Sequence, residues 1–246
     1  MSFLDRYTSG ERERVWSDLV ALGHQARHAA YFGDAYAVAK ETMRRVRRNV
    51  EVLAERLTGL GYEFARPEAA HIPPDGAAIE RIVAIEDSLG PLPLSLRAFY
   101  EVVGSVDFTQ SWDQLVQYHR PGRERAGDLQ ILGEEDPLVV APLTELVEAE
   151  ASDGRVYFCF AADEFHKANY SGGENYHVWL PDPRADFEIV GMYEIEERFV
   201  EYLRATFSWG GFRGRVDTLE EDQSRCRKIA PKLGVVRSLS EGLLPI

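Results

Sequence analysis

Residues 79–108 read IERIVAIEDSLGPLPLSLRAFYEVVGSVDF, and their pattern decides the class of fold. In the first part, hydrophobic residues recur at steps of three and four, which predicts a helix from Ile79 to Leu89. The sequence Pro91-Leu92-Pro93 ends that helix, because a proline cannot continue one helix but is tolerated in the first turn of the next. A second helix is therefore predicted over residues 95–103, and Gly104 is predicted to end it.

A helical pair is predicted upstream, within residues 1–66. Its second helix carries a long apolar stripe, which comprises Met43, Val46, Val50, Leu53, Leu57 and Leu60. Phe32-Gly33-Asp34 is typical of the turn between the two helices, and the proline-rich residues 67–78 predict a linker. The arginines between positions 44 and 48 indicate a solvated helix face rather than a phosphate contact, because no aromatic residues are interleaved with them.

The hydrophobic pattern changes to that of strands after Gly104. Short apolar runs separated by turn residues predict strands at 138–140, 155–161, 175–180 and 187–190. The run Val156–Phe160 is apolar throughout, as expected for a central strand buried on both faces. A closing helix is predicted from Glu194 to about Phe207. We therefore expect an α+β domain over residues 79–212, in which helices pack on a mixed or antiparallel sheet, followed by a basic, partly helical tail over residues 213–246.

Negative charge is concentrated in one part of the chain. The formal net charge is −13, and residues 134–201 contain 17 acidic and 4 basic side chains. Such acidity repels nucleic acid and anionic membranes and favours encounters with basic surfaces. We therefore expect a basic protein as the partner, with no binding to nucleic acid or membranes. The alternative is a surface whose charge serves only solvation. The sequence leaves the oligomeric state open.

The cysteine content and the N-terminal residues indicate the cytosol. Two cysteines, Cys159 and Cys226, do not suggest a disulfide scaffold and fit a reducing compartment. The N-terminal residues lack the apolar core of a signal peptide. No stretch approaches the ~18 uninterrupted apolar residues that predict a membrane-spanning helix. We therefore expect a cytoplasmic protein.

No motif in the sequence predicts a catalytic site. His24 and His28 are four residues apart on a predicted helix, but the glutamate of the zinc-protease pattern is missing. Four residues could converge as ligands of a hydrolytic metal ion: Asp163, Glu164, His166 and His177. Such a group is common in an acidic segment, and the usual nucleophile and phosphate-loop motifs are missing. We therefore expect no enzyme activity, no cofactor and no metal, with a metal-dependent hydrolase as the alternative.

Aromatic and acidic side chains are mixed within the acidic stretch. Seven of them are predicted to contact a partner protein: Asp163, Glu164, Phe165, Tyr170, Glu174, Tyr176 and Trp179. Aromatic rings contribute burial at protein interfaces, while surrounding charges steer a partner of the opposite sign. The alternative is that these rings belong to the core, since strand alternation buries about half of them.

Residues 79–108 resemble the opening of domains of the SUKH superfamily (Smi1/Knr4-like domains). The matching positions are Ile82, Glu86, Leu89, Gly90, Leu92, Pro93, Leu96, Phe99, Tyr100 and Gly104. In this pattern a tight bend joins two helices, and the aromatic residues of the second helix dock it on a sheet. The similarity covers residues 79–209, including the later strands and the closing helix. Members often have Asn-Gly at the end of the second helix, where this chain has Val103-Gly104.

The resemblance implies a function as well as an α+β fold. In bacteria it implies an immunity protein, which binds and neutralises a cognate secreted toxin that is often a nuclease. Eukaryotic relatives act as regulatory interaction modules, and the family shares no catalytic site. An acidic inhibitor would imitate the charge of a nuclease's substrate, which agrees with the net charge of this chain.

Overall fold

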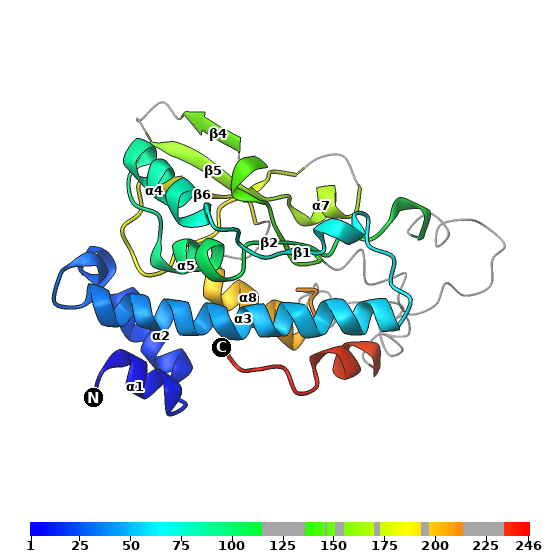
Figure 1. Cartoon of the computed structure of the whole chain (residues 1–246), viewed down its shortest axis with the longest axis horizontal. Coiled ribbons are helices and arrows are strands. Elements are labelled where there is room, and N and C mark those ends of the chain that lie inside the picture. Colours follow the sequence, from blue (N-terminus) through cyan, green and yellow to red (C-terminus); the bar gives the residue numbers. More distant parts are fainter. Residues whose placement is uncertain (115–135, 146, 151–154, 170–172, 193–196, 214–233) are drawn as a thin grey trace, which may run out of the picture.

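The structure is a computed structural model of the 246-residue chain. It describes residues 1–114, 136–145, 147–150, 155–169, 173–192, 197–213 and 234–246. Figure 1 shows a long helix across the molecule, with short helices and the C-terminal segment on one side and the sheets on the other.

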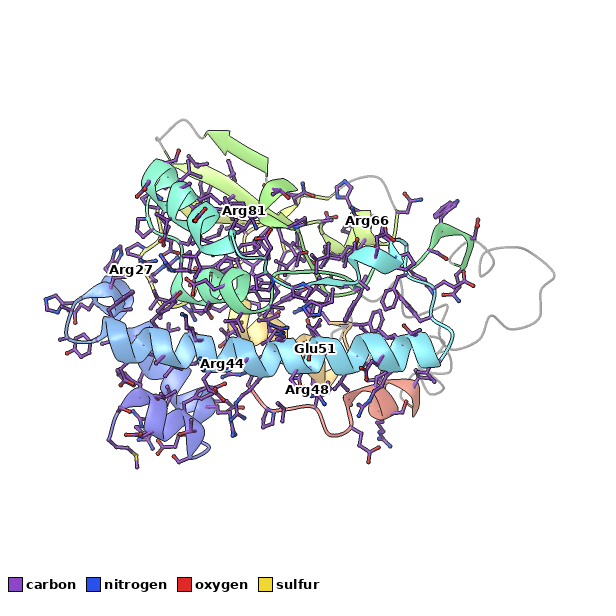
Figure 2. The ribbon with its side chains drawn as sticks, viewed as in Figure 1. Arg27, Arg44, Arg48, Glu51, Arg66 and Arg81 are labelled. Atoms are coloured by element: carbon purple, nitrogen blue, oxygen red, sulfur yellow. The ribbon has the colours of Figure 1, made fainter. Side chains whose placement is uncertain are left out.

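The long helix is α3 (Phe32–Gly59), whose 28 residues bury the predicted apolar stripe except for Leu60, which follows the helix and is 44% exposed. It packs against α5 (Leu94–Val102) and also against α1 (Phe3–Thr8). On its solvent side, Arg44 and Arg48 are 62% and 64% exposed and form ion pairs with glutamates on the same helix (Figure 2). This agrees with a solvated face for these two arginines.

The expected turn at Phe32-Gly33-Asp34 is wrong, because α3 begins at Phe32. The chain before it forms α1, α2 (Arg12–Ala21) and the 3₁₀ helix η1 (Gly23–Arg27), so the upstream region is more than a pair of helices. Asp34 accepts a hydrogen bond from the backbone N–H of Leu4 at 3.0 Å. A residue type typical of turns therefore sits in a helix, where it holds the start of another helix in place.

Part of the predicted linker, residues 67–78, belongs to the sheet region. They contain η2 (Pro67–Ala69) and β1 (His71–Ile72), which pairs antiparallel with β2 (Ser105–Asp107). Buried residues from Tyr7 to Ile246 form one hydrophobic cluster. The N-terminal helices therefore share a core with the rest of the described chain.

The helix–bend–helix unit is close to its prediction. α4 (Ala78–Leu89) is followed by Gly90, whose φ of +84° favours glycine, and α5 starts one residue earlier than expected. The carboxylate of Glu86 accepts the backbone N–H of Leu92 at 3.1 Å and forms an ion pair with Arg27 at 2.9 Å. A side chain of α4 therefore braces the bend.

Two three-stranded antiparallel sheets follow the orders β1-β2-β3 and β4-β5-β6. The strands not yet described are β3 (Val139–Val140), β4 (Val147–Glu150), β5 (Val156–Ala161) and β6 (Tyr176–Leu180). β5 is the central strand of its sheet, but only Phe158 and Phe160 are fully buried, while Tyr157 and Cys159 are partly exposed. The expected burial of β5 on both faces is therefore wrong. The expected strand at 187–190 forms only the isolated bridges His177–Val190 and Glu188–Arg198.

The closing helix is α8 (Phe199–Ser208), which begins later than the expected Glu194. Its Phe199 ring lies between those of Phe99, Phe160 and Phe187, with centroid distances of 5.6, 5.6 and 5.2 Å. These rings join α5, the β4-β5-β6 sheet and α8 in one core. The described chain is therefore an α+β protein with small antiparallel sheets.

Candidate protein-binding surface

The outer face of the β4-β5-β6 sheet carries a compact aromatic group. Tyr157 on β5 faces Trp179 on β6 in register, and their ring centroids are 3.8 Å apart. The ring of His177 lies 4.4 Å from that of Tyr157, and the guanidinium of Arg155 lies 4.3 Å from the centroid of Trp179. We call these four residues the sheet-face group: Arg155, Tyr157, His177 and Trp179.

Strand alternation explains why these side chains share a face. Phe158, the neighbour of Tyr157 on β5, and Val178, between His177 and Trp179 on β6, point into the core and are almost fully buried. Tyr157 and Trp179 are partly exposed and Arg155 is exposed. Aromatic rings with an arginine are the side chains most often found at the centre of protein interfaces.

His177 is the buried member of the sheet-face group, with 1% of its surface exposed. Its Nδ1 lies 3.0 Å from the carbonyl oxygen of Asn175, and its backbone exchanges two 3.0 Å hydrogen bonds with Val190. Its Nε2 has no hydrogen-bond partner within the described part of the chain. The ring therefore supports Tyr157 and Trp179 from below rather than offering itself to a partner.

Asp163 does not belong to a contact surface, because its side chain is fully buried. It caps α7 (Glu164–Lys167): Oδ1 accepts the backbone N–H of His166 at 2.8 Å. The other oxygen lies against Gly173, where a Cβ atom would come within 1.6 Å of it. The predicted partner contact at Asp163 is therefore corrected to a structural cap.

Tyr176 is also an internal residue, with 1% of its surface exposed. Its hydroxyl donates to Glu164 at 2.7 Å and lies 3.3 Å from Asp136. Lys167, whose side chain is fully buried, forms a 2.6 Å ion pair with Asp136 and lies 3.3 Å from the hydroxyl of Tyr202. Burial raises the pKa of Asp136, while the charge of Lys167 opposes that shift. Tyr176 therefore belongs to a buried polar cluster that joins α7, β6 and α8.

The other predicted contact residues have mixed positions. Trp179 lies in the sheet-face group, and Glu174 is exposed just before β6. Glu164 and Phe165 are partly exposed on α7. Tyr170 lies outside the described residues.

Much of the predicted acidic surface is inside the protein. Four described aspartates of residues 134–201 are buried, namely Asp136, Asp163, Asp182 and Asp186. Two described glutamates, Glu188 and Glu197, form ion pairs with Arg198 and Arg213 at 2.8 and 2.7 Å. The four aspartates and Glu197 are engaged inside the protein, whereas Glu188 forms its ion pair at the surface, so the charge available to a partner is smaller than the residue count suggests.

Asp186 shows the cost of such burial. Its carboxylate accepts the hydroxyl of Ser95 at 2.6 Å and the backbone N–H of Val200 at 3.2 Å, at the start of α8. Burial nevertheless raises the pKa of Asp186 to about 6, because these neutral donors and the backbone N–H of Phe187 do not replace the hydration of a full charge.

Of the four residues in the metal-ligand alternative, the structure places one pair within hydrogen-bonding distance. Nδ1 of His166 lies 2.6 Å from Oδ1 of Asp163, but among the described residues no three His, Cys, Asp or Glu side chains gather in a metal-binding arrangement. His24 lies in η1 and His28 follows it, so the expected α-helical spacing of these two histidines is wrong.

Comparisons with family models, curated proteins and solved structures found no match to this chain. Within the part of the chain that the structure describes, none of the helices has the length and apolar content needed to cross a bilayer.

Sequence reasoning missed Arg155 and Tyr157 as surface residues. Their signal was the alternation around Phe158, which shows the shared face only once β5 and β6 are paired in register.

Proposed function

We propose that this protein is a cytosolic, SUKH-like binding protein, and that it acts as an immunity protein that neutralises a cognate basic toxin by stoichiometric binding. In this proposal the chain performs no catalysis and uses no cofactor. The contact surface is centred on the sheet-face group, with Glu174 at its edge.

The observation that carries the proposal is the construction of the sheet-face group. Tyr157 and Trp179 are partly exposed on the sheet face, and their rings lie against a buried histidine and an arginine. Rigid aromatic anchors lose little conformational entropy on binding, which is a property of interface hot spots. A binding function therefore explains why two aromatic rings are held at partly exposed positions on the sheet face.

The helix–bend–helix unit supports the family part of the proposal. Gly90 and Gly104 have positive φ angles of +84° and +94°, which fits glycines that a family pattern would retain. Leu96, Phe99 and Tyr100 are almost fully buried, as the resemblance requires of residues that dock α5. These features are structural, so they support a shared fold more strongly than a shared partner.

Identification of the partner is the first test. The tagged chain is used to capture proteins from its native lysate at low and high salt, and each captured protein is then expressed alone. We expect one basic protein that arrests growth when expressed alone, and whose toxicity an equimolar amount of this chain relieves. A captured protein that is harmless would overturn the immunity proposal and favour the regulatory module of the same fold.

Trp179→Ala tests the surface. We expect it to weaken binding of the partner by about 2 kcal/mol or more, roughly thirtyfold, because a half-buried tryptophan at the centre of an interface is a typical hot spot. Trp112→Ala is the matched control, since Trp112 is 56% exposed and outside the sheet-face group. Titration calorimetry measures both variants after urea unfolding has shown that they are folded. Equal affinities for the two variants would remove the sheet face from the proposal.

A further inference from the structure

The segment 234–246 lies along α3, on the side opposite the sheets (Figure 1). The side chain of Asn49 on α3 binds both main-chain groups of one residue of this segment. Its Nδ2 donates to the carbonyl oxygen of Leu244 at 2.9 Å, and its Oδ1 accepts the N–H of Leu244 at 2.7 Å. Asn49 is only 1% exposed, so this amide is a buried group whose hydrogen bonds depend on the segment.

Three arginines repeat the same kind of contact. Arg56 donates to the carbonyl oxygens of Leu239 and Glu241 at 2.6 and 2.7 Å. Arg204 of α8 donates to the carbonyl oxygen of Ile246 at 2.9 Å, and Arg45 donates to that of Pro245 at 3.3 Å. All of these bonds are made to main-chain atoms, so they depend on the path of the segment, a helix over residues 234–240 followed by a non-helical end, rather than on a particular side chain.

Apolar anchors fix the register of the segment. Leu239 and Ile246, seven positions apart, are 0% and 6% exposed. Space for Leu239 exists because Gly210 has no side chain: a Cβ atom there would lie 2.6 Å from the Cβ of Leu239. Leu244, between the anchors, is exposed, as are Arg237 and Ser238 just before Leu239. Buried apolar anchors with main-chain contacts between them are an arrangement by which proteins bind peptides.

The groove is built on elements that have other packing partners. α3 buries its apolar stripe against α5, and α8 is fixed by the rings around Phe199. The segment itself buries few of its side chains, so its release costs less than unfolding of the whole protein.

We propose that α3 and α8 form a peptide-binding groove whose resident ligand is residues 234–246, and that a free peptide of this sequence replaces the resident segment. The ligand class is a peptide that forms a short helix followed by a non-helical end, with Leu and Ile seven positions apart and no required charge. This inference does not depend on the proposed function, because the groove and the sheet-face group share no residue.

The test uses the full chain with a protease recognition sequence introduced between residues 214 and 233. The protein is folded first and then cut, and a fluorescent peptide of residues 234–246 is added in excess. We expect the labelled peptide to replace the resident segment at a stoichiometry of one, as measured by anisotropy and native mass spectrometry. If the cut protein stays folded and does not exchange, or if it unfolds on cutting, the proposal is wrong.

Changes in the peptide avoid any effect on folding of the protein. Leu239→Glu in the peptide should abolish exchange, because it places a charge against Gly210 in the core, whereas Arg237→Ala in the peptide should leave exchange unchanged.

In the protein, Arg56→Ala should weaken binding of the peptide at least about tenfold through loss of its carbonyl contacts. Arg44→Ala is the matched control on the same helix, since Arg44 makes an ion pair with Glu41 and touches no part of the segment. Equal affinities for these two protein variants would contradict main-chain recognition by Arg56.

Discussion

Asp186 and Lys167 show how buried charges in this protein depend on their neighbours. Asp186 has only neutral donors, from Ser95 and from the start of α8, and burial raises its pKa to about 6. Lys167 has a direct carboxylate partner in Asp136, at 2.6 Å. Removal of the charge is therefore expected to have opposite effects at the two sites. It should remove a destabilising buried charge at Asp186, whereas it should lower the stability of the protein at Lys167.

Asp186→Asn should make the protein less sensitive to pH. The folded pKa of about 6 lies above the unfolded value of 3.8, so the folded state retains its proton as the unfolded state loses it. Stability from this group is therefore present below about pH 4 and is lost as the pH rises to about 6, a change on the order of 3 kcal/mol. Urea unfolding at pH 4, 5, 6 and 7 should show a smaller loss across this window in Asp186→Asn. An unchanged slope would mean that Asp186 does not titrate there.

Lys167→Met should destabilise the protein by about 3–5 kcal/mol, because it leaves the buried Asp136 without its partner. The double variant Lys167→Met with Asp136→Asn should recover much of that loss, and chemical unfolding measures both. Arg14→Met is the control, since Arg14 is exposed on α2 and should change stability by less than about 0.5 kcal/mol. If the double variant is as unstable as the sum of the two single variants, the pair does not act as a unit.

At the scale of secondary-structure elements, those that depend on a local pattern were predicted from the sequence, whereas those that depend on long-range contacts were not. α4 and α5 were predicted to within one residue, because helical periodicity and the proline break lie within the quoted stretch. β1 was missed, because a strand of two residues has no detectable alternation and exists only through its pairing with β2. Asp163 and Tyr176 were assigned to the surface for a related reason. Their burial depends on α7, Gly173 and Asp136, which no local pattern places beside them.

Gly104→Ala should disturb the junction between α5 and β2. Gly104 has a φ of +94°, and a Cβ atom there would lie 2.1 Å from the carbonyl oxygen of Ile72. We expect a loss of about 2 kcal/mol or more, because both the backbone angle and the adjacent strand β1 must change. Gly76→Ala is the matched control, since it has no atom within 4 Å of the added Cβ. Thermal unfolding compares the two, and equal midpoints would contradict the close approach of β1.

At the scale of the whole molecule, one hydrophobic cluster connects the N-terminal helices, the sheets, α8 and the C-terminal segment. The sequence suggested a helical pair separated from an α+β domain by a linker. That division was inferred from the prolines of residues 67–78. Which elements share a core depends instead on their apolar faces. The stripe on α3 was recognised correctly, but its packing against α5 was not.

A shared core predicts one unfolding transition. Trp16 on α2 is 3% exposed, and Trp209 follows α8, so the two report on the N-terminal helices and on the later part of the fold. Variants that retain only one of these tryptophans should have the same urea midpoint by fluorescence, because neither region is stable without the other. Two midpoints that differ by more than the experimental error would show that the N-terminal helices unfold as a separate unit.

The contact between Asn49 and Leu244 also has a consequence for synthesis of the chain. These residues are 195 positions apart, so a ribosome that adds about 5–20 residues per second completes the second about 10–40 s after the first. During that interval α3 exists without α5 for part of the time and without Leu244 for all of it. The nascent chain therefore carries an uncovered apolar helix for many seconds, which makes α3 the expected site of chaperone binding during translation.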